Sequence, residues 1–513
     1  MQDTGVMNRI FIATFVSFVF FIFFDYFFVQ PTTSKVENIS EVKKETTKTI
    51  SKNNSLLKTQ IVSTIKSDSF EIQIDNLGRI HQYILEKNIF NDNKGDKLKI
   101  VSQKLPKILE IRFKDKELNT ELFNSAVSVD RKEIIIKEKP ETITITQKLK
   151  ELTIKKILTF YPDGHYQLKI ELSKDVEYYL AVGRVEAEVT MYSFHGALLE
   201  KEDGSLEMID DGDAENSSFK NIKIAASVDH YYTTFLYDLK NGMNVIETMG
   251  ENDKPLLYIV GKQNLSLGGY IGPKYVKVLD NINPELTKVV EYGIMTFLAK
   301  PMFALLYKFY EWTKNWGIAT ILFVILVRII LFPLTYRGMA SMYKMKILAP
   351  KLKEIKEKYS KDPKKFQLKT MELYKKENVN PLGGCLPMLI QIPIFFAIYR
   401  VLVNAIELKG AGFLWIDDLS VMDPYFILPI LMGVTMYAHQ MITPNNFTDP
   451  MQEKIFKFLP VIFTFFMITF SAGLVLYWTI NNVLSFMQQF IINKSMEAKG
   501  LIIKSTTSKD NKK

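Results

Sequence analysis

The 513-residue chain is 47% hydrophobic and 24% charged, and its formal net charge is +9. Its apolar runs lie near the N-terminus and after residue 300, which is typical of a membrane protein with one large water-soluble domain. The single cysteine, Cys385, excludes an intramolecular disulfide, and five scattered histidines without HxH or HExxH spacing argue against metal catalysis.

The first apolar run, Ile10–Val29, follows Arg9 and is long enough to cross a bilayer, since about 20 residues at roughly 1.5 Å each reach about 30 Å. We interpret residues 10–29 as an uncleaved transmembrane anchor. A cleaved signal peptide is the alternative, but the small residues of a cleavage site are missing after the run. Residues 30–68 are rich in Thr, Ser, Lys, Glu and Asn, which predicts a disordered linker.

Residues 69–300 contain short runs that alternate polar and apolar side chains, which predicts an antiparallel β-sandwich. The clearest runs are Phe70-Glu-Ile-Gln-Ile, Ile108-Leu-Glu-Ile-Arg-Phe, Thr142-Ile-Thr-Ile-Thr and Tyr166-Gln-Leu-Lys-Ile-Glu-Leu. The acidic stretch 210–215 lacks the Gly and Glu positions of an EF-hand loop, so we interpret it as a solvated loop rather than a calcium site. Residues 301–316 place apolar side chains at helical spacing among charged ones, which predicts an amphipathic helix on the membrane surface; a soluble helix is the alternative.

Five further transmembrane helices are predicted within residues 317–492. Three spans, 317–335, 381–399 and 425–442, precede a run of 36 uncharged residues between Lys457 and Lys494. At about 1.5 Å each these would reach roughly 54 Å, too long for one crossing, so we predict a tight hairpin of two short helices around Ser471-Ala-Gly473. The predicted fold class is a polytopic α-helical membrane protein with six transmembrane helices, five of them in one core, and an extracytoplasmic β-sandwich.

Basic residues in the short loops predict the orientation. The segment between Arg337 and Glu377 holds 13 Lys/Arg against 5 Asp/Glu, whereas 404–424 holds only Lys409 against four acidic residues. Together with the lysine-rich tail 493–513, this places the N-terminal residues 1–9, the C-terminus and the 337–379 segment in the cytoplasm and residues 30–300 outside it.

The 337–379 segment is itself predicted to be a helical hairpin. Its apolar residues follow a heptad seam and a break at Ser360-Lys-Asp-Pro363 separates two helices, leaving a strongly basic outer face. The seam residues are Met345, Leu348, Leu352, Ile355 and Tyr359. Anionic lipid is the expected partner of the basic face, and ribosomal RNA is the second candidate on electrostatic grounds.

Arg328 lies near the middle of its span, where an arginine costs about 2.5–3.5 kcal/mol on insertion scales and cannot escape by losing its proton. The only carboxylate in any predicted span, Asp25, lies at a different depth. We therefore predict that Arg328 faces water or an anion; a structural arginine bonded to backbone carbonyls is the alternative.

Polar residues on other spans supply the walls of a possible groove around Arg328. Trp478, Asn482, Ser485 and Gln489 are spaced 4, 3 and 4, so they share one face of the last helix, and Gln391 sits mid-span. We predict a hydrophilic substrate groove formed by Arg328, Gln391, Trp478, Asn482, Ser485 and Gln489. For Thr435 and His439 we prefer simple hydrogen bonding between helices.

Several motifs resemble the YidC insertases of Gram-negative bacteria, closely over about 312–500 and more loosely over 69–290. They are Asn380-Pro-Leu-Gly-Gly-Cys-Leu-Pro387, Gln391-Ile-Pro-Ile-Phe395, Leu428-Pro-Ile-Leu-Met-Gly-Val434, Asp449-Pro-Met-Gln452 and Ser471-Ala-Gly-Leu-Val-Leu-Tyr-Trp478, with Asp229-His-Tyr-Tyr and Tyr270-Ile-Gly-Pro273 in the sandwich region. The resemblance implies a five-helix core in the bacterial inner membrane, with a groove open to the cytoplasm and the lipid, and a periplasmic sandwich. Arg328 matches the family's groove arginine, and Trp478 stands where the family has an aromatic. Val324 departs from the family's hydroxyl residue one turn earlier.

The resemblance also implies the function: insertion and folding of nascent membrane proteins, alone or beside the Sec translocon, with ribosomes as donors and a monomer as the working unit. We predict no enzymatic activity, no cofactor and no metal. A small-solute or ion transporter is the alternative, although the spans lack coupled carboxylates and inverted repeats. An intramembrane hydrolase lacks a nucleophile and base motif, and a structural scaffold would leave the mid-membrane arginine unexplained.

Overall fold

The computed structural model describes residues 57–499, apart from residues 92–94, 105, 188–192, 361, 378, 380–385 and 444–449. The predicted anchor 10–29, most of the linker and residues 500–513 of the tail lie outside the described residues. The described chain divides into a β unit that ends at Glu291 and a helical unit that begins at Tyr292.

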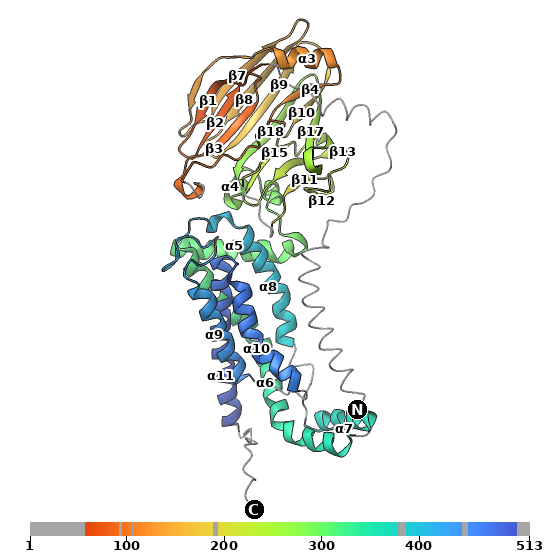
Figure 1. Cartoon of the computed structure of the whole chain (residues 1–513), viewed down its shortest axis with the longest axis vertical. Coiled ribbons are helices and arrows are strands. Elements are labelled where there is room, and N and C mark those ends of the chain that lie inside the picture. Colours follow the sequence, from red (N-terminus) through yellow and green to blue (C-terminus); the bar gives the residue numbers. More distant parts are fainter. Residues whose placement is uncertain are drawn as a thin grey trace, which may run out of the picture. The chain divides into compact units, whose positions relative to one another are not determined.

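The β unit contains three sheets (Figure 1). The nine-stranded sheet has the order β12 (Leu206–Asp210), β11 (Gly196–Glu200), β14 (Ile224–Val228), β15 (Tyr232–Tyr237), β18 (Leu265–Pro273), β9 (His165–Leu172), β8 (Thr153–Phe160), β7 (Glu141–Lys148) and β5 (Ser128–Val129). The five-stranded sheet has the order β13 (Ser217–Ile222), β16 (Met243–Met249), β17 (Pro255–Lys262), β10 (Glu177–Ala181) and β4 (Ile111–Phe113). The four-stranded sheet has the order β3 (Ile80–Leu85), β2 (Phe70–Asp75), β1 (Ile61–Lys66) and β6 (Glu133–Ile135).

The nine-stranded sheet packs against both smaller sheets, through β11 and β14 on β17 and through β18 on β3. The short helices of the unit are α3 (Lys116–Asn124), α4 (Val276–Ile282) and the 3-10 helices η1 (Asn88–Phe90), η2 (Glu251–Asp253) and η3 (Pro284–Val289). The predicted sandwich is confirmed, with two corrections. Strand β1 lies within the predicted linker, because its Ser63 and Ile65 turn inward once they pair with β2. The β1–β6 pair is parallel, so the sandwich is not purely antiparallel.

Strand β8 shows how the alternating pattern builds the core. Every second residue from Ile154 is buried, including Leu158 and Phe160, so one face of the strand points inward. Lys156 falls on that inward face and is 3% exposed. Its ammonium group donates to the carbonyl oxygens of Gly78 at 2.8 Å and Leu109 at 2.7 Å.

The helical unit begins with η4 (Gly293–Met295) and α5 (Thr296–Thr313). Helix α5 starts five residues before the predicted surface helix and ends where Lys314 adopts a left-handed conformation. Asn315 then caps the next helix, since its side chain accepts from the amide of Ile318 at 3.0 Å. Phe297 and Trp312 of α5 are mostly exposed, whereas Met302 and Leu306 are buried.

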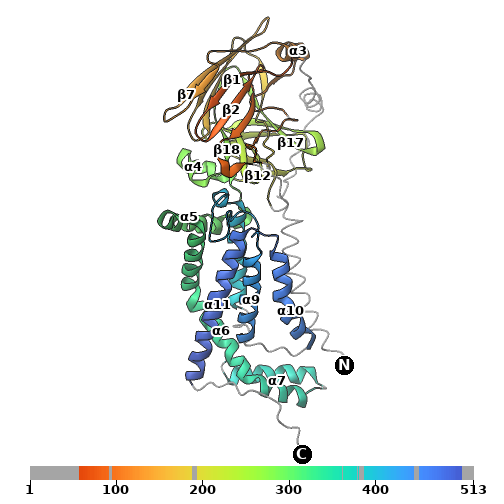
Figure 2. The same cartoon turned by 60° about the vertical axis from the view of Figure 1, so that its left-hand side comes forward.

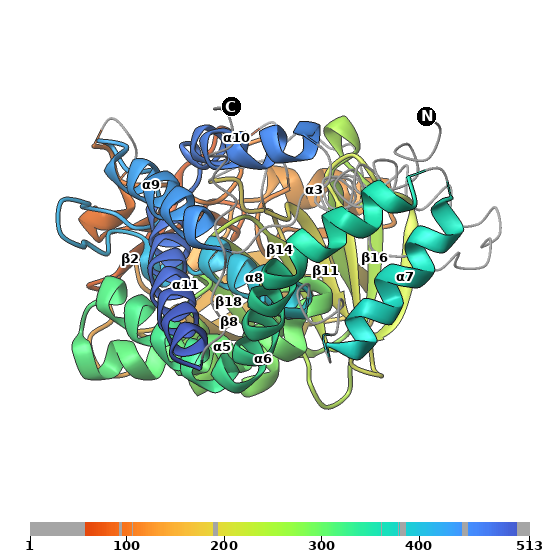
Figure 3. The same cartoon turned by 90° about the horizontal axis from the view of Figure 1, so that it is seen from below.

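Helix α6 (Trp316–Lys358) is continuous over 43 residues, so the predicted span 317–335 and the first helix of the basic hairpin form one element. The change from apolar to basic side chains alters the surroundings of the helix but offers no break in its backbone hydrogen bonds. Helix α7 (Pro363–Lys376) begins at the predicted break and folds back beside the end of α6 (Figure 3). The side chains of Lys351 and Glu377 join the two helices at 2.8 Å.

The remaining helices are α8 (Leu386–Asn404), η6 (Ile406–Leu408), α9 (Ile427–Ile442), α10 (Pro450–Met467) and α11 (Ala472–Ala498). The break between α10 and α11 lies where the hairpin was predicted, but α11 has 27 residues and is not short. Helix α8 extends to Asn404, past the predicted end at 399, and residues 381–385 of the predicted span lie outside the described residues. Helix α11 packs between α6 and α9 (Figure 2).

By length and composition, α6 alone among the described helices is long and apolar enough to cross a membrane. Residues 390–404 and 427–442 form shorter apolar helices. The number of six spans therefore stays a prediction.

Candidate functional site

Arg328 projects from α6 toward α11 and is 8% exposed. Its position follows from the contact between the two helices, which pack along each other across the helical unit. A charged group this deeply buried must satisfy its N–H donors within the protein, because water has little access to it.

Oxygen atoms of α11 supply those acceptors. The side-chain oxygen of Asn481 accepts from Nε of Arg328 at 3.0 Å and from Nη2 at 2.7 Å. Nη2 also donates to the backbone oxygen of Asn481 at 3.2 Å and to the hydroxyl of Ser485. Nη1 donates to the side-chain oxygen of Gln488 at 3.3 Å. Residues 481, 485 and 488 recur one helical turn apart, so a single face of α11 receives the guanidinium.

No carboxylate neutralises this charge within the described part of the chain, where Arg328 forms no ion pair. Hydrogen bonds to a charged group contribute about 1.5–3 kcal/mol each, so several of them can hold the arginine in an apolar bundle. They do not cancel its charge. The site is thus a positioned cation that has no anionic partner in the described part of the chain.

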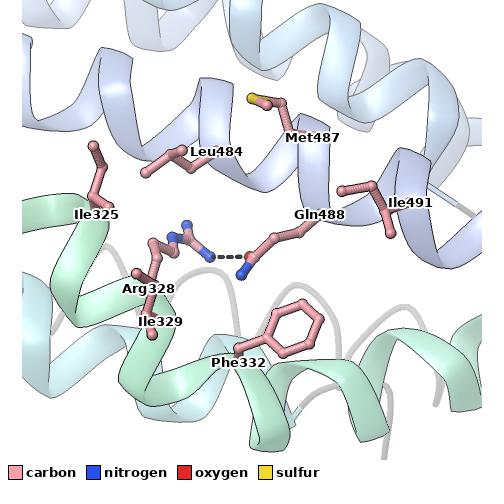
Figure 4. A pocket seen from close by; sticks show the side chains of 8 residues that line it. All are labelled: Ile325, Arg328, Ile329, Phe332, Leu484, Met487, Gln488 and Ile491. Atoms are coloured by element: carbon pink, nitrogen blue, oxygen red, sulfur yellow. Dashed lines mark hydrogen bonds between the residues drawn. The ribbon is translucent and has the colours of Figure 1, made fainter.

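A cleft of about 350 Å³ lies beside Arg328, between α6 and α11 (Figure 4). Arg328 and Gln488 supply its polar groups, and apolar side chains supply the rest. Its lining residues are Ile325, Arg328, Ile329, Phe332, Leu484, Met487, Gln488 and Ile491. Ile329, Met487 and Ile491 are more than half exposed, so the cleft opens on the outer surface of the helical unit.

The predicted groove residues do not gather around Arg328. Trp478 packs edge-on against Phe395 of α8, with ring centroids 4.5 Å apart, and lies 5.8 Å from Phe463 of α10. Gln391 donates to the hydroxyl of Tyr477 at 3.5 Å. These side chains therefore contribute to the junction of α8, α10 and α11.

Asn482 and Gln489 face α9 instead. Asn482 donates to the backbone oxygen of Met432 at 3.5 Å, and the fully buried Gln489 donates to Asn493 at 2.7 Å. Asn493 in turn donates to the backbone oxygen of Ile442 at 3.0 Å. Of the five residues predicted to share the groove with Arg328, Ser485 alone contacts it.

Asn481 and Gln488 were missed by the sequence analysis. The face of α11 that meets Arg328 is rotated by roughly 60° from the predicted face, at about 100° per residue. The spacing of Asn481, Ser485 and Gln488 was a visible signal, but two polar stripes overlap on this helix and no local pattern says which one meets α6. Val324, one turn before Arg328, is buried, and the hydroxyl group near the arginine comes from Ser485.

Other chemical sites receive no support from the described residues. They contain no group of three or more His, Cys, Asp or Glu side chains that could hold a metal ion. In the acidic stretch 210–215, Asp211 pairs with Arg184. Thr435 donates to the backbone oxygen of Met432 at 2.9 Å, within its own helix α9, so the bond that the structure gives it is not the predicted one between helices.

Two family models match the chain. One is described as "60Kd inner membrane protein" and matches residues 308–499, and the other is described as "YidC periplasmic domain" and matches residues 62–305. A Wolinella succinogenes protein named "Membrane protein insertase YidC" is 50% identical over 86% of this chain and 83% of its own length. A Campylobacter jejuni protein of the same name is 45% identical over 95% of this chain and 96% of its own length. A crystal structure described as an active YidC insertase with its first transmembrane domain resolved is 20% identical to this chain, and the match covers 84% of this chain and 94% of that one, at a TM-score of 0.37.

Proposed function

Because the chain belongs to the YidC family of membrane protein insertases, we propose that Arg328 is the point at which it receives polar segments of its clients. The protein is an insertase of the inner membrane with a periplasmic domain, and its substrates are nascent membrane proteins. The transporter alternative has no support from the comparisons.

The observation that carries the proposal is the charge of Arg328. Its guanidinium is positioned by Asn481 and Ser485 and has no acidic partner in the described chain. A carboxylate of an incoming client would supply that partner, and its attraction to the arginine would be strong at a site with little water. The positive charge therefore favours clients whose translocated segments are acidic.

The polar segment would cross the membrane at the arginine while the apolar part of the client moves into lipid along α8 and α10. Gln391, Trp478, Asn482 and Gln489 would contribute polar groups to neighbouring parts of this path. The apolar part of α10, which runs from after Lys457 to Met467, is short and would thin the bilayer locally, which shortens the path. No covalent bond is made or broken in these steps of insertion, and the steps need no cofactor or metal.

The same proposal assigns the partners. The basic α6–α7 hairpin and the lysine-rich tail would bind ribosomes and anionic lipid, because both present phosphate groups. The protein would work as a monomer, alone or beside the Sec translocon. Both termini would lie in the cytoplasm, and residues 10–29 would be a membrane anchor.

The test is complementation in a strain depleted of its own insertase. Arg328→Ala should block insertion of clients with acidic translocated segments, while Arg337→Ala, which removes an exposed arginine of the same helix, should support growth. Normal growth and normal insertion with Arg328→Ala would overturn the role of the arginine.

A further inference from the structure

We propose that Gln488 is a displaceable cap on Arg328, whose side-chain oxygen occupies the place that a client carboxylate takes during insertion. The inference rests on the proposed function and deepens it, because it names the nitrogen of Arg328 that meets the client and the side from which the client approaches.

The contacts of the three guanidinium nitrogens are unequal. Nε and Nη2 are held by Asn481 and Ser485, with Asn481 accepting through one side-chain oxygen from both nitrogens. Nη1 has one acceptor in the described structure, the side-chain oxygen of Gln488, and at 3.3 Å this is the longest of the arginine's hydrogen bonds. Asn481 and Ser485 therefore act as positioning residues, and Nη1 is the nitrogen most easily given a new partner.

The cleft between α6 and α11 gives access to this nitrogen. Gln488 is half-buried in the cleft wall, beside the exposed residues Met487 and Ile491 (Figure 4). Asn481 and Ser485 do not line the cleft. A group that enters the cleft meets Gln488 before it meets the residues that fix the arginine, so it can replace the cap and leave the rest of the site in place.

Chemistry favours the exchange for a carboxylate over other groups. Gln488 offers a neutral amide oxygen, so its hydrogen bond to Arg328 carries charge on the donor alone, whereas a carboxylate adds the Coulomb attraction between two opposite charges. The bond between Arg328 and an acidic side chain of the client would be stronger than the bond between Arg328 and Gln488. A neutral amide or hydroxyl of the client would bond to Arg328 about as strongly as Gln488 does, so it would gain nothing by the exchange. The released Gln488 has an unbranched side chain with several rotamers open to it in the cleft.

Substitutions at Gln488 separate a displaceable cap from a structural contact. Gln488→Glu keeps the shape of the side chain but gives Arg328 an ion-pair partner that a client cannot easily displace. Gln488→Met keeps the length and removes the acceptor. We expect Gln488→Glu to slow insertion of an acidic client into proteoliposomes at least tenfold, as Arg328→Ala does, while Gln488→Met, which removes the acceptor that the client must displace, inserts it faster than the wild-type protein. A matched client with Asn in place of each Asp should be inserted equally well by all of these proteins.

The outcomes are distinguishable. If Arg328→Ala is defective but Gln488→Glu inserts the acidic client normally, or Gln488→Met fails as badly as Arg328→Ala, the cap is wrong and the proposed function stands. If Arg328→Ala itself inserts the acidic client normally, the proposed function falls. Thermal unfolding of each purified variant shows whether a loss of insertion reflects a loss of fold. Photocrosslinking from position 487 to a stalled acidic client tests the cap without altering Gln488, and the exposed position 434 on α9, which lies off the proposed path of the client, is the control. A crosslink at 434 and none at 487 would contradict approach through this cleft.

Discussion

Arg328 remains charged inside an apolar bundle because α11 offers it oxygen acceptors on one face. A carboxylate on α11 would hold the guanidinium more strongly, but it would also neutralise it. Neutral acceptors satisfy the N–H groups of the guanidinium without cancelling its positive charge, so the charge can still attract an anionic group of another molecule. The Asn, Ser and Gln side chains around the arginine are therefore what the proposed receiving site requires.

Asn481 is expected to contribute more to the stability of the helical unit than its neighbour Asn482. Asn481→Leu removes the side-chain acceptor of two charged hydrogen bonds, which should lower the free energy of unfolding by roughly 2–5 kcal/mol. Asn482→Leu removes one long bond to a backbone oxygen and should lower it by about 1 kcal/mol. Thermal or denaturant unfolding in detergent, followed by tryptophan fluorescence, measures the difference; equal losses would contradict the role given to Asn481.

Lys156 gives the β unit a stability that depends on pH. Burial lowers the pKa of this lysine from 10.5 to about 7. Below about pH 7 the lysine is charged in both the folded and the unfolded state, and its buried charge destabilises the folded state by the largest amount. Between about pH 7 and 10.5 only the unfolded state keeps the proton, so the free energy of unfolding rises with pH.

Lys156→Met should remove this rise, which is on the order of a few kcal/mol. Hydrogen exchange of β7–β9 peptides in the full-length protein, compared between variant and wild type at each pH, measures it. Lys155→Met is the control, because Lys155 lies on the outward face of the same strand. A wild-type pH dependence in Lys156→Met would show that other groups dominate.

At the residue scale the sequence singled out Arg328, whose role stays a prediction, but it did not reveal the partners that the structure gives it. A central arginine stands out in any apolar span, whereas Asn481 and Asn482 are neighbours of the same type. Only the rotation of α11 against α6 decides that the first contacts the arginine and the second faces α9. That rotation depends on packing over the whole helix, so no short pattern could have revealed it.

At the scale of elements, the contact between α9 and α10 requires a glycine. A Cβ atom at Gly433 of α9 would lie 2.0 Å from the hydroxyl oxygen of Thr464 on α10. That hydroxyl is itself engaged, donating to the backbone oxygen of Pro460 at 2.8 Å. The two helices therefore approach as closely as their backbones and this one side chain permit.

Gly433→Ala should destabilise the helical unit by about 1–3 kcal/mol, because it overpacks this contact. Thr464→Ala, combined with it, should restore part of the loss by removing the atoms that clash. Unfolding in detergent measures both variants. If the double variant is no more stable than Gly433→Ala alone, the close approach is not the cause.

The basic hairpin carries a second prediction at this scale. Replacing Lys353, Lys364 and Lys365 with Gln should weaken ribosome binding and lower the slope of log affinity against log salt by roughly 2–3, at about 0.7–0.9 per phosphate contact. Replacing Lys155, Lys169 and Lys174 of the β unit removes the same charge and should change neither. Equal effects of the two triple variants would mean that net charge, rather than the hairpin, governs binding.

Helix boundaries were the weaker part of the sequence analysis for a physical reason. The end of the second span was placed where charges begin, but backbone hydrogen bonding in α6 continues through that change for more than twenty further residues. The break at Asp362 was predicted correctly, because it has a local cause: Asp362 caps α7 and Pro363 begins it. The pattern of charges along a helix indicates which parts of it face water or lipid. Capping residues and prolines indicate where the helix begins and ends.

At the scale of the whole molecule, the division into a sandwich and a helical bundle followed directly from the sequence, since a period of two and long apolar runs are strong and distinct signals. The pairing of the eighteen strands among the described residues into three sheets could not be predicted in this way. β1 pairs with β6 across about seventy residues and β4 with β10 across a similar distance, and such contacts leave no trace in a local pattern.

The proposed function of Arg328 depends on a direct electrostatic contact between its guanidinium and a carboxylate of the client, which a double-mutant cycle measures. Insertion rates into proteoliposomes are determined for wild-type protein and Arg328→Ala, each with an acidic client and with its Asp→Asn counterpart. We predict that Arg328→Ala slows insertion of the acidic client at least tenfold and leaves the neutral client unchanged. Equal slowing of both clients would mean that the arginine and the carboxylate act independently, and that Arg328 serves the fold rather than the client.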